Sequence, residues 1–311
     1  MKHDIYNYLI FFLYIVIYPF VYVGLINKVK AVWCGRKGAP VMQPLYDFIK
    51  LIKKSEIISR TTTFVFYFAP VVSFSAVLFS AFVVPGPHGT SLISFDGDYI
   101  FFAYLLSLSK FVSISAAMDT GSSFEGMGAA REASFTSFVE PAYMMLLTTI
   151  VYATGFLSYQ QILSVIQGSA GWSFLTAAPI IVAIFIMLLS EGSRIPVDDP
   201  KTHLELTMIH EVMILDNSGK SLALINYTSA LKMCVISSIV ASILIPQNMS
   251  GWKYTILFFS IITGVSVCVA LIESFFARLK MNHVPRFVFT MISVAIFVMA
   301  VSFLKIFRGV L

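Results

Sequence analysis

The chain has 311 residues, of which 58% are hydrophobic and only 12% charged, and its mean hydropathy is +0.86. This composition is typical of an integral membrane protein and excludes an ordinary soluble enzyme. The net charge is +5, and the three cysteines lie far apart without a C-x-x-C pair. The chain alone therefore cannot supply four thiolates to an iron–sulfur cluster.

Apolar runs divide the chain into about eight segments long enough to cross a bilayer, at roughly 20 residues each. The first run lacks a basic leader and a small-residue cleavage site, so we interpret it as a retained helix rather than a signal peptide. The sequence predicts one all-α integral membrane domain over residues 1–311, with a cytoplasmic amphipathic helix in addition. The predicted membrane helices lie near residues 5–26, 63–84, 99–118, 132–157, 173–190, 222–245, 254–276 and 286–307.

The segment between the first two runs, residues 27–62, is mostly polar and basic. Within it, apolar residues recur at roughly helical spacing, and lysines such as Lys50 stand between them; the apolar residues are Leu45, Phe48, Ile49, Leu51 and Ile52. This pattern predicts an amphipathic helix over residues 45–54 that lies in the membrane interface. Its lysines would face lipid headgroups or an acidic partner.

Basic residues divide unevenly between the two sides of the predicted membrane domain. Fifteen fall in the connections 27–62, 119–131, 191–221 and 277–286, whereas the opposite side has only Lys2, Lys253, Lys305 and Arg308. The positive-inside rule predicts that these four connections are cytoplasmic and that both termini face the other side. Topology explains the basic excess, so nucleic acid is not needed as a partner.

Four charged residues lie inside the apolar runs: Lys110, Glu140, Lys232 and Glu273. Each would cost about 2.5–3.5 kcal/mol at mid-membrane unless it is paired or hydrated. They are either structural ion pairs or parts of a hydrated internal path, and four of them in so poorly charged a chain favour the path. Pro141 follows Glu140 and frees a backbone carbonyl beside it, which predicts a carboxylate open to proton exchange.

A glycine-rich stretch, residues 119–128, precedes the fourth run. A phosphate-binding loop needs a preceding strand and usually a lysine, and neither is present. The stretch is therefore predicted to be a tight cytoplasmic turn that carries Glu125, Arg131 and Glu132 to the membrane face.

The connection 191–221 concentrates polar groups in an otherwise apolar chain. It holds two of the five histidines, His203 and His210, and six of the sixteen acidic residues: Glu191, Asp198, Asp199, Glu205, Glu211 and Asp216. It is either a solvated connector or a working surface, and this concentration favours the working surface. His203, His210 and Glu211 would share one face of a helix. Ile214 excludes the zinc-protease spacing, so partner contact or proton relay is favoured over metal binding.

Motifs across nearly the whole chain resemble those of the complex I subunit 1 family. They are Arg36-Lys37-Gly38 with Gln43-Pro44, Gly128-Ala129-Ala130-Arg131-Glu132 with Glu140-Pro141, Glu191-x-x-Arg194-x-Pro196-x-Asp198-x-Pro200 with Glu205-Leu206, and Pro285-Arg286. Pro196-Val197-Asp198-Asp199-Pro200 departs from the Pro-Phe-Asp-Leu-Pro that is usual in quinone-reducing members. Asp119-Thr120-Gly121-Ser122 is more similar to the branch found in membrane-bound NiFe hydrogenases and formate hydrogenlyase, where the homologue is subunit 4.

The resemblance implies a membrane-anchoring and ion-coupling subunit of an energy-converting hydrogenase or formate hydrogenlyase-like oxidoreductase complex, in a prokaryotic cytoplasmic membrane. The complex would link redox chemistry to proton or sodium translocation. Expected partners are cytoplasmic hydrogenase-like large and small subunits, antiporter-like membrane subunits and the lipid bilayer. Those soluble partners would carry the iron–sulfur clusters and the NiFe centre, and this chain would hold no cofactor, metal or complete active site.

Two alternative functions stand beside this interpretation. One is the quinone-site subunit of a complex I-like NADH-quinone oxidoreductase, in which the chain binds quinone. The other is a stand-alone secondary transporter, which the lack of an inverted repeat or of paired broken helices disfavours.

The candidate site residues fall into two groups. The ion-coupling candidates are Lys110, Glu140, Glu191, Glu205, Glu211, Lys232 and Glu273. The candidates for docking a soluble partner are Arg36, Arg131, Glu132, Arg194, Asp198, Asp199, His203, His210 and Asp216.

Overall fold

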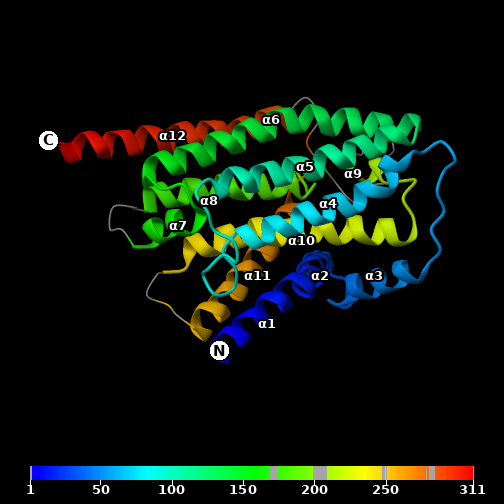
Figure 1. Cartoon of the computed structure of the whole chain (residues 1–311), viewed down its shortest axis with the longest axis horizontal. Coiled ribbons are helices and arrows are strands. Elements are labelled where there is room, and N and C mark those ends of the chain that lie inside the picture. Colours follow the sequence, from blue (N-terminus) through cyan, green and yellow to red (C-terminus); the bar gives the residue numbers. More distant parts are fainter. Residues whose placement is uncertain are drawn as a thin grey trace.

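The computed structural model describes residues 2–168, 174–198, 209–246, 249, 251–277, 279 and 284–310. Every regular element in these residues is an α-helix, which confirms the all-α prediction (Figure 1). The helices are α1 (Lys2–Val16), α2 (Tyr18–Trp33), α3 (Gln43–Lys53), α4 (Phe64–Val83), α5 (Asp98–Asp119), α6 (Ser123–Thr154), α7 (Tyr159–Gly168), α8 (Phe174–Glu191), α9 (His210–Met213), α10 (Gly219–Leu244), α11 (Trp252–Phe275) and α12 (Val284–Val310).

The number of membrane-spanning helices differs from the prediction. Each of the eight predicted apolar runs contains helix. Within the described residues, α4, α5, α6, α10 and α11 are long and apolar enough to span a membrane, and the bent pair α1–α2 raises the total from 5 to 6. The apolar parts of α8 and α12 are shorter, Ala177–Glu191 and Arg286–Val301. The structure therefore agrees with an integral membrane protein but does not confirm eight spans.

Three boundaries also differ from the prediction. Helix α6 begins at Ser123, so the predicted loop 119–131 is reduced to a short turn. Glu125 lies in the first turn of α6, where a carboxylate interacts favourably with the helix dipole. Helix α2 continues past the predicted end near residue 26 as far as Trp33, and α7 forms inside a connection for which no helix was predicted.

Helix α10 forms the centre of the bundle. In its most apolar 18-residue window 89% of residues are buried, against 39–44% in the other spanning helices. It packs against α2, α3, α4, α7, α8 and α11, and α5 and α6 extend the bundle beyond α4 and α8 (Figure 1). Lys232 lies in the buried part of this helix and must therefore find a partner inside the bundle.

The first predicted span is broken into α1 and α2, which meet at an angle of 47°. Pro19 explains the break, because it has no N–H to donate to the carbonyl of Ile15 one turn earlier. The hydroxyl of Tyr227 on α10 donates to that carbonyl instead. On either side of the break, Tyr14 donates to the Cys234 carbonyl at 3.0 Å and Tyr22 bonds Ser237 at 2.9 Å. The break is thus held against the central helix.

Helix α3 is the predicted amphipathic helix. Its half-buried residues Leu45 and Phe48 pack on the core, whereas Lys50 is exposed. The Phe48 ring lies 5.1 Å from Phe20 on α2 and 5.6 Å from Tyr227, centroid to centroid. The amphipathic pattern therefore located the helix, but only part of the predicted apolar face packs on the core, since Ile49 and Ile52 are exposed.

Candidate functional site

Four buried charges from four helices form a continuous ion-pair cluster. Lys110 Nζ on α5 lies 3.2 Å from Glu132 Oε1 on α6 and 3.0 Å from Glu191 Oε1 at the end of α8. The other oxygen of Glu191 lies 3.6 Å from Lys232 Nζ on α10. The exposed fractions of the four side chains are between 5% and 11%. We call these residues the four-charge cluster.

The four-charge cluster is neutral as a whole, with two carboxylates and two ammonium groups. A buried ion that loses its partner is strongly destabilised, by about 3–5 kcal/mol, so each member depends on the others. Within the described residues, Glu191 Oε2 accepts no hydrogen bond, because 3.6 Å to Lys232 exceeds hydrogen-bond range. Glu191 therefore keeps one carboxylate oxygen available to a proton or a water molecule.

A second ion-pair group ties the connection after α8 to the bundle. Glu273 near the end of α11 accepts from Lys30 Nζ of α2 at 2.6 Å and from Arg194 Nη1 at 3.3 Å. The Glu273 side chain is fully buried and that of Arg194 is 9% exposed. This group joins α2, α11 and the segment that follows Glu191, so it fixes the end of α8 where the four-charge cluster lies.

Backbone contacts position the residues after α8. Ser193 adopts a positive φ of 50°, which reverses the chain just past Glu191. Asp198 is buried, and its Oδ2 accepts the backbone N–H of His210 at 2.9 Å and that of Ile209 at 3.3 Å. Gly128 on α6 allows this approach, because a Cβ there would lie 3.0 Å from the Ile209 carbonyl oxygen. His210 is thereby brought from the connection to the edge of the bundle.

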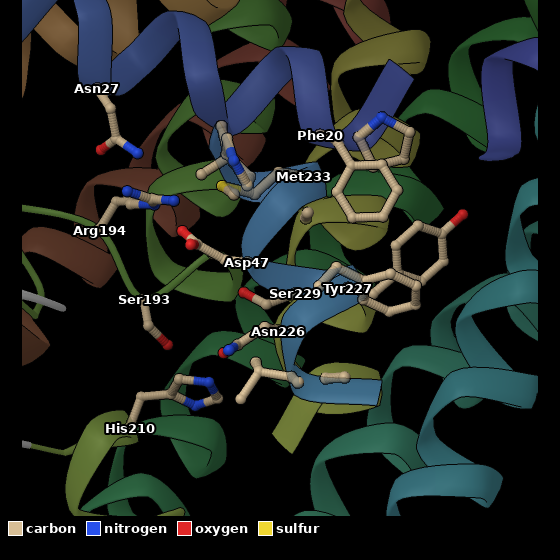
Figure 2. A pocket seen from close by; sticks show the side chains of 18 of the residues that line it. Phe20, Asn27, Asp47, Ser193, Arg194, His210, Asn226, Tyr227, Ser229 and Met233 are labelled. Atoms are coloured by element: carbon tan, nitrogen blue, oxygen red, sulfur yellow. The ribbon is translucent and has the colours of Figure 1, made fainter. Parts of the chain in front are cut away.

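An open cavity of about 260 Å³ lies between α2, α3, α10 and the segment after α8. Figure 2 shows Asn27, Ser193, Arg194 and His210 toward one side and the rings of Phe20 and Tyr227 toward the other. Phe48 and Leu51 of α3 complete the apolar side. One side thus offers the Arg194 guanidinium, neutral hydrogen-bonding groups and the Asp47 carboxylate, and the other offers aromatic surface, an arrangement suited to an amphiphilic molecule.

Smaller cavities continue inward from the open one. A cavity of about 40 Å³ is lined by all four residues of the four-charge cluster together with His210, Ser193 and Ser229. A further cavity of about 10 Å³ lies between Glu191 and Glu140. Glu140 also lines an open groove of about 770 Å³ between α5 and α6. Small cavities with room for single water molecules are therefore lined by Glu191 and Glu140, between the open cavity and the groove.

The structure brings together most of the predicted ion-coupling residues. Lys110, Glu191 and Lys232 lie in the four-charge cluster, and Glu273 lies in the second group. Glu140 is half-buried between two cavities, and Glu211 lines the open one. Glu205 lies outside the described residues.

The predicted docking residues are more dispersed. Arg36 is exposed, and Arg131, His210 and Asp216 are half-buried. Glu132, Arg194 and Asp198 are buried and bind residues of this chain. Asp199 and His203 lie outside the described residues. Contact of these residues with a soluble partner stays a prediction.

Sequence reasoning did not assign a site role to Lys30 or Asp47. Lys30 was counted only as a topological charge, yet it binds Glu273. Lys30 lies in the last turn of α2, which extends further than the apolar run predicted. A longer predicted helix would have placed Lys30 on the bundle and indicated a partner for it. Asp47 lines the open cavity from α3, and its sequence context gave no such signal.

Comparisons with known proteins agree with this arrangement. Residues 6–303 match the family described as NADH dehydrogenase. Hydrogenase-4 component C of Escherichia coli is 29% identical over 226 residues, 72% of this chain and 70% of the relative. Formate hydrogenlyase subunit 4 of E. coli is 26% identical over 85% of this chain and 87% of its own length. An NADH-quinone oxidoreductase subunit of Rickettsia africae is 28% identical over 55% of this chain and 51% of its own length.

A solved structure has the same fold along nearly the whole chain. It is a chain of the membrane-bound sulfane sulfur reductase, an archaeal respiratory membrane complex, with a TM-score of 0.82 and 19% identity. The match covers 97% of this chain and 100% of that one. The apolar helices and these relatives indicate a membrane protein. Because the family match spans almost all its residues, the chain belongs to the NADH dehydrogenase family, the family of complex I subunit 1.

Proposed function

We propose that this chain is the membrane-anchoring and ion-coupling subunit of an energy-converting hydrogenase or formate hydrogenlyase-like complex. It has eight spans with both termini on the non-cytoplasmic side. Cytoplasmic hydrogenase-like large and small subunits dock on the exposed parts of the connections and on α3, and those subunits hold the iron–sulfur clusters and the NiFe centre. Antiporter-like subunits adjoin it in the membrane.

The observation that carries the proposal is the four-charge cluster. Its charges come from four helices, and each of the two central members has two partners of opposite charge. Protonating Glu191 would weaken its attraction to Lys110 and Lys232 together, so one change in charge alters the neighbours on α5 and α10. Ion pairs whose only role is to hold helices together do not need adjacent cavities, whereas residues of this cluster line two of them.

The similarity to two E. coli proteins supports the choice of complex. Formate hydrogenlyase subunit 4 corresponds to this chain almost from end to end, since the match covers 85% of one and 87% of the other. Hydrogenase-4 component C matches 72% of the chain. The segment Pro196–Pro200 also lacks the Pro-Phe-Asp-Leu-Pro pattern of the quinone-reducing members. The hydrogenase branch is accordingly the better assignment.

Glu191→Gln in the assembled complex tests the proposal. The amide keeps the size of the side chain but cannot carry the charge that binds both lysines. In sealed vesicles, electron transfer to an artificial acceptor should persist while ion uptake falls by about a hundredfold, the lower end of the effect typical of a residue that transfers protons. Asp96→Asn, at an exposed position before α5, is the matched control. Normal ion uptake by the Glu191 variant would refute a coupling role for the cluster.

Quinone binding is the second candidate function, and the open cavity favours it. The cavity of about 260 Å³ offers His210 and Arg194 at its polar side and Phe20 and Phe48 at its aromatic side. These side chains fit a quinone head group with an apolar tail, which would supply a two-electron acceptor at this position.

Binding of a short-chain quinone to the purified complex tests this second function. Phe48→Ala should weaken binding by roughly tenfold, because it removes an aromatic surface of the cavity worth about 1.5 kcal/mol or more. Tyr46→Ala, at an exposed aromatic residue of the same helix, should not. Equal binding by both variants would place the quinone elsewhere or exclude it.

A further inference from the structure

The cavities of the site form a series in which each neighbouring pair shares a titratable residue. The open cavity and the 40 Å³ cavity share His210, together with Ser193 and Ser229. The 40 Å³ and 10 Å³ cavities share Glu191, and the 10 Å³ cavity and the groove between α5 and α6 share Glu140. His210 is thus the titratable side chain in both the open cavity and the cavity of the four-charge cluster.

The backbone of His210 is held independently of its side chain. Its N–H donates to Asp198, and it begins the short helix α9, which packs against α6. Within the described residues, the imidazole itself makes no hydrogen bond, although its neighbours are hydrogen-bonding groups. A half-buried imidazole with both nitrogens available can take a proton on one side and release one on the other.

The charged groups that line the two cavities together with His210 come from several elements. They are Asp47 on α3, Lys110 on α5, Glu132 on α6, Glu191 and Arg194 at and after the end of α8, Glu211 on α9 and Lys232 on α10, and the Tyr227 hydroxyl group also lines the open cavity. The inner cavities, of about 40 Å³ and 10 Å³, have room for about one water molecule each and not for a sodium ion with its hydration shell. Their size favours a relayed proton over a hydrated sodium ion.

We propose that His210 is the relay through which protons pass from the open cavity to the four-charge cluster, and that the translocated ion is accordingly H⁺. This inference rests on the proposed coupling function and deepens it. One imidazole nitrogen accepts a proton from water in the open cavity while the other releases its proton toward Glu191. The ring returns to its neutral form by exchange of tautomers, so no net charge stays on His210.

Chemical rescue tests the relay. His210→Ala in the assembled complex should lower proton uptake per electron at least about tenfold in sodium-free vesicles, with electron transfer preserved. Free imidazole should restore most of that uptake, because it can enter the open cavity and supply the missing group. Removal of a merely structural residue is not repaired by a soluble base. His210→Gln, which keeps a side chain of similar length, replaces the alanine variant if that one does not assemble.

Two variants measured beside it separate the possible results. His88→Ala removes a half-buried histidine that lies beside Asn7 and away from both cavities, so proton uptake should stay normal. Glu191→Gln should lose uptake without rescue by imidazole. Normal uptake in His210→Ala, loss without rescue, or uptake that requires sodium would overturn the relay. If both His210→Ala and Glu191→Gln translocate normally, the relay and the proposed coupling function both fail. If Glu191→Gln loses translocation and His210→Ala does not, only the relay fails.

Discussion

Glu191 at the end of α8 binds Lys110 of α5 at 3.0 Å, and Lys110 is at the same time 3.2 Å from Glu132 of α6. Lys110 therefore pairs with two carboxylates, whereas Lys232 approaches Glu191 at the longer distance of 3.6 Å. The two buried lysines are chemically alike, but Lys110 has two carboxylate partners and Lys232 has one.

Lys110→Met should destabilise the protein more than Lys232→Met. Loss of Lys110 leaves Glu132 without its ion-pair partner and Glu191 with the more distant Lys232, at a cost of about 3–5 kcal/mol. Loss of Lys232 leaves both carboxylates paired with Lys110, at 3.2 Å and 3.0 Å. Thermal unfolding in detergent should rank the two variants in this order, and Lys253→Met, at an exposed residue, should match the wild type. The reverse order would show that Lys232 contributes more than Lys110 to the stability of the four-charge cluster.

Glu140→Gln should separate electron transfer from translocation. The half-buried carboxylate lies between the 10 Å³ cavity and the open groove of α5 and α6, so the amide keeps the shape but removes the exchangeable charge. Assembly and electron transfer to artificial acceptors should persist, and ion uptake by sealed vesicles should fall at least about tenfold. Ser137→Ala in the same groove is the control, and normal pumping by Glu140→Gln would make Glu140 a structural residue.

A double-mutant cycle should detect coupling between Arg194 and Glu273. The two side chains are 3.3 Å apart and nearly inaccessible to solvent, so Arg194→Gln and Glu273→Gln should be non-additive by about 0.5–3 kcal/mol. Unfolding of the single and double variants measures this energy. The same cycle with Arg36 in place of Arg194 should be additive, because Arg36 is exposed to solvent. Additivity for Arg194 would show that the pair does not anchor the segment after α8.

Gly24→Ala should destabilise the protein although alanine favours helix. In an exposed helix the change would stabilise by about 0.5–1 kcal/mol. Here the added Cβ would lie 1.8 Å from the Val41 carbonyl oxygen, a backbone atom that cannot move without shifting the chain before α3. A lower melting temperature and altered ligand access to the open cavity should follow. The matched change Gly264→Ala, on α11 where a Cβ meets no atom of the described residues within 4 Å, should not destabilise.

Reporter fusions should establish the orientation of the chain. The charge asymmetry predicts cytoplasmic signals for fusions at Lys54, Asp199 and Lys280, and signals from the other side at His88, Gly168 and Asn248. Periplasmic activity of alkaline phosphatase and cytoplasmic fluorescence are complementary readouts. A consistent reversal at all six positions would show that the basic residues do not set the topology.

The sequence by itself determined the membrane class, the helical runs and the amphipathic helix. These depend on local composition and on the spacing of apolar residues, which are properties of each segment alone. It also singled out Lys110, Lys232, Glu140 and Glu273, because a charge within an apolar run is costly whatever its surroundings.

Only the tertiary structure decided which charges meet. Lys110 pairs with Glu132 and Glu191 because α5, α6 and α8 place them at the same level, and helix packing is not encoded in a local pattern. Lys30 was predicted only as a topological charge, but it is the half-buried ion-pair partner of Glu273 because α2 extends further than its apolar run. His210 lies between two cavities because its backbone N–H donates to Asp198. The spacing of apolar residues in the sequence does not predict this contact.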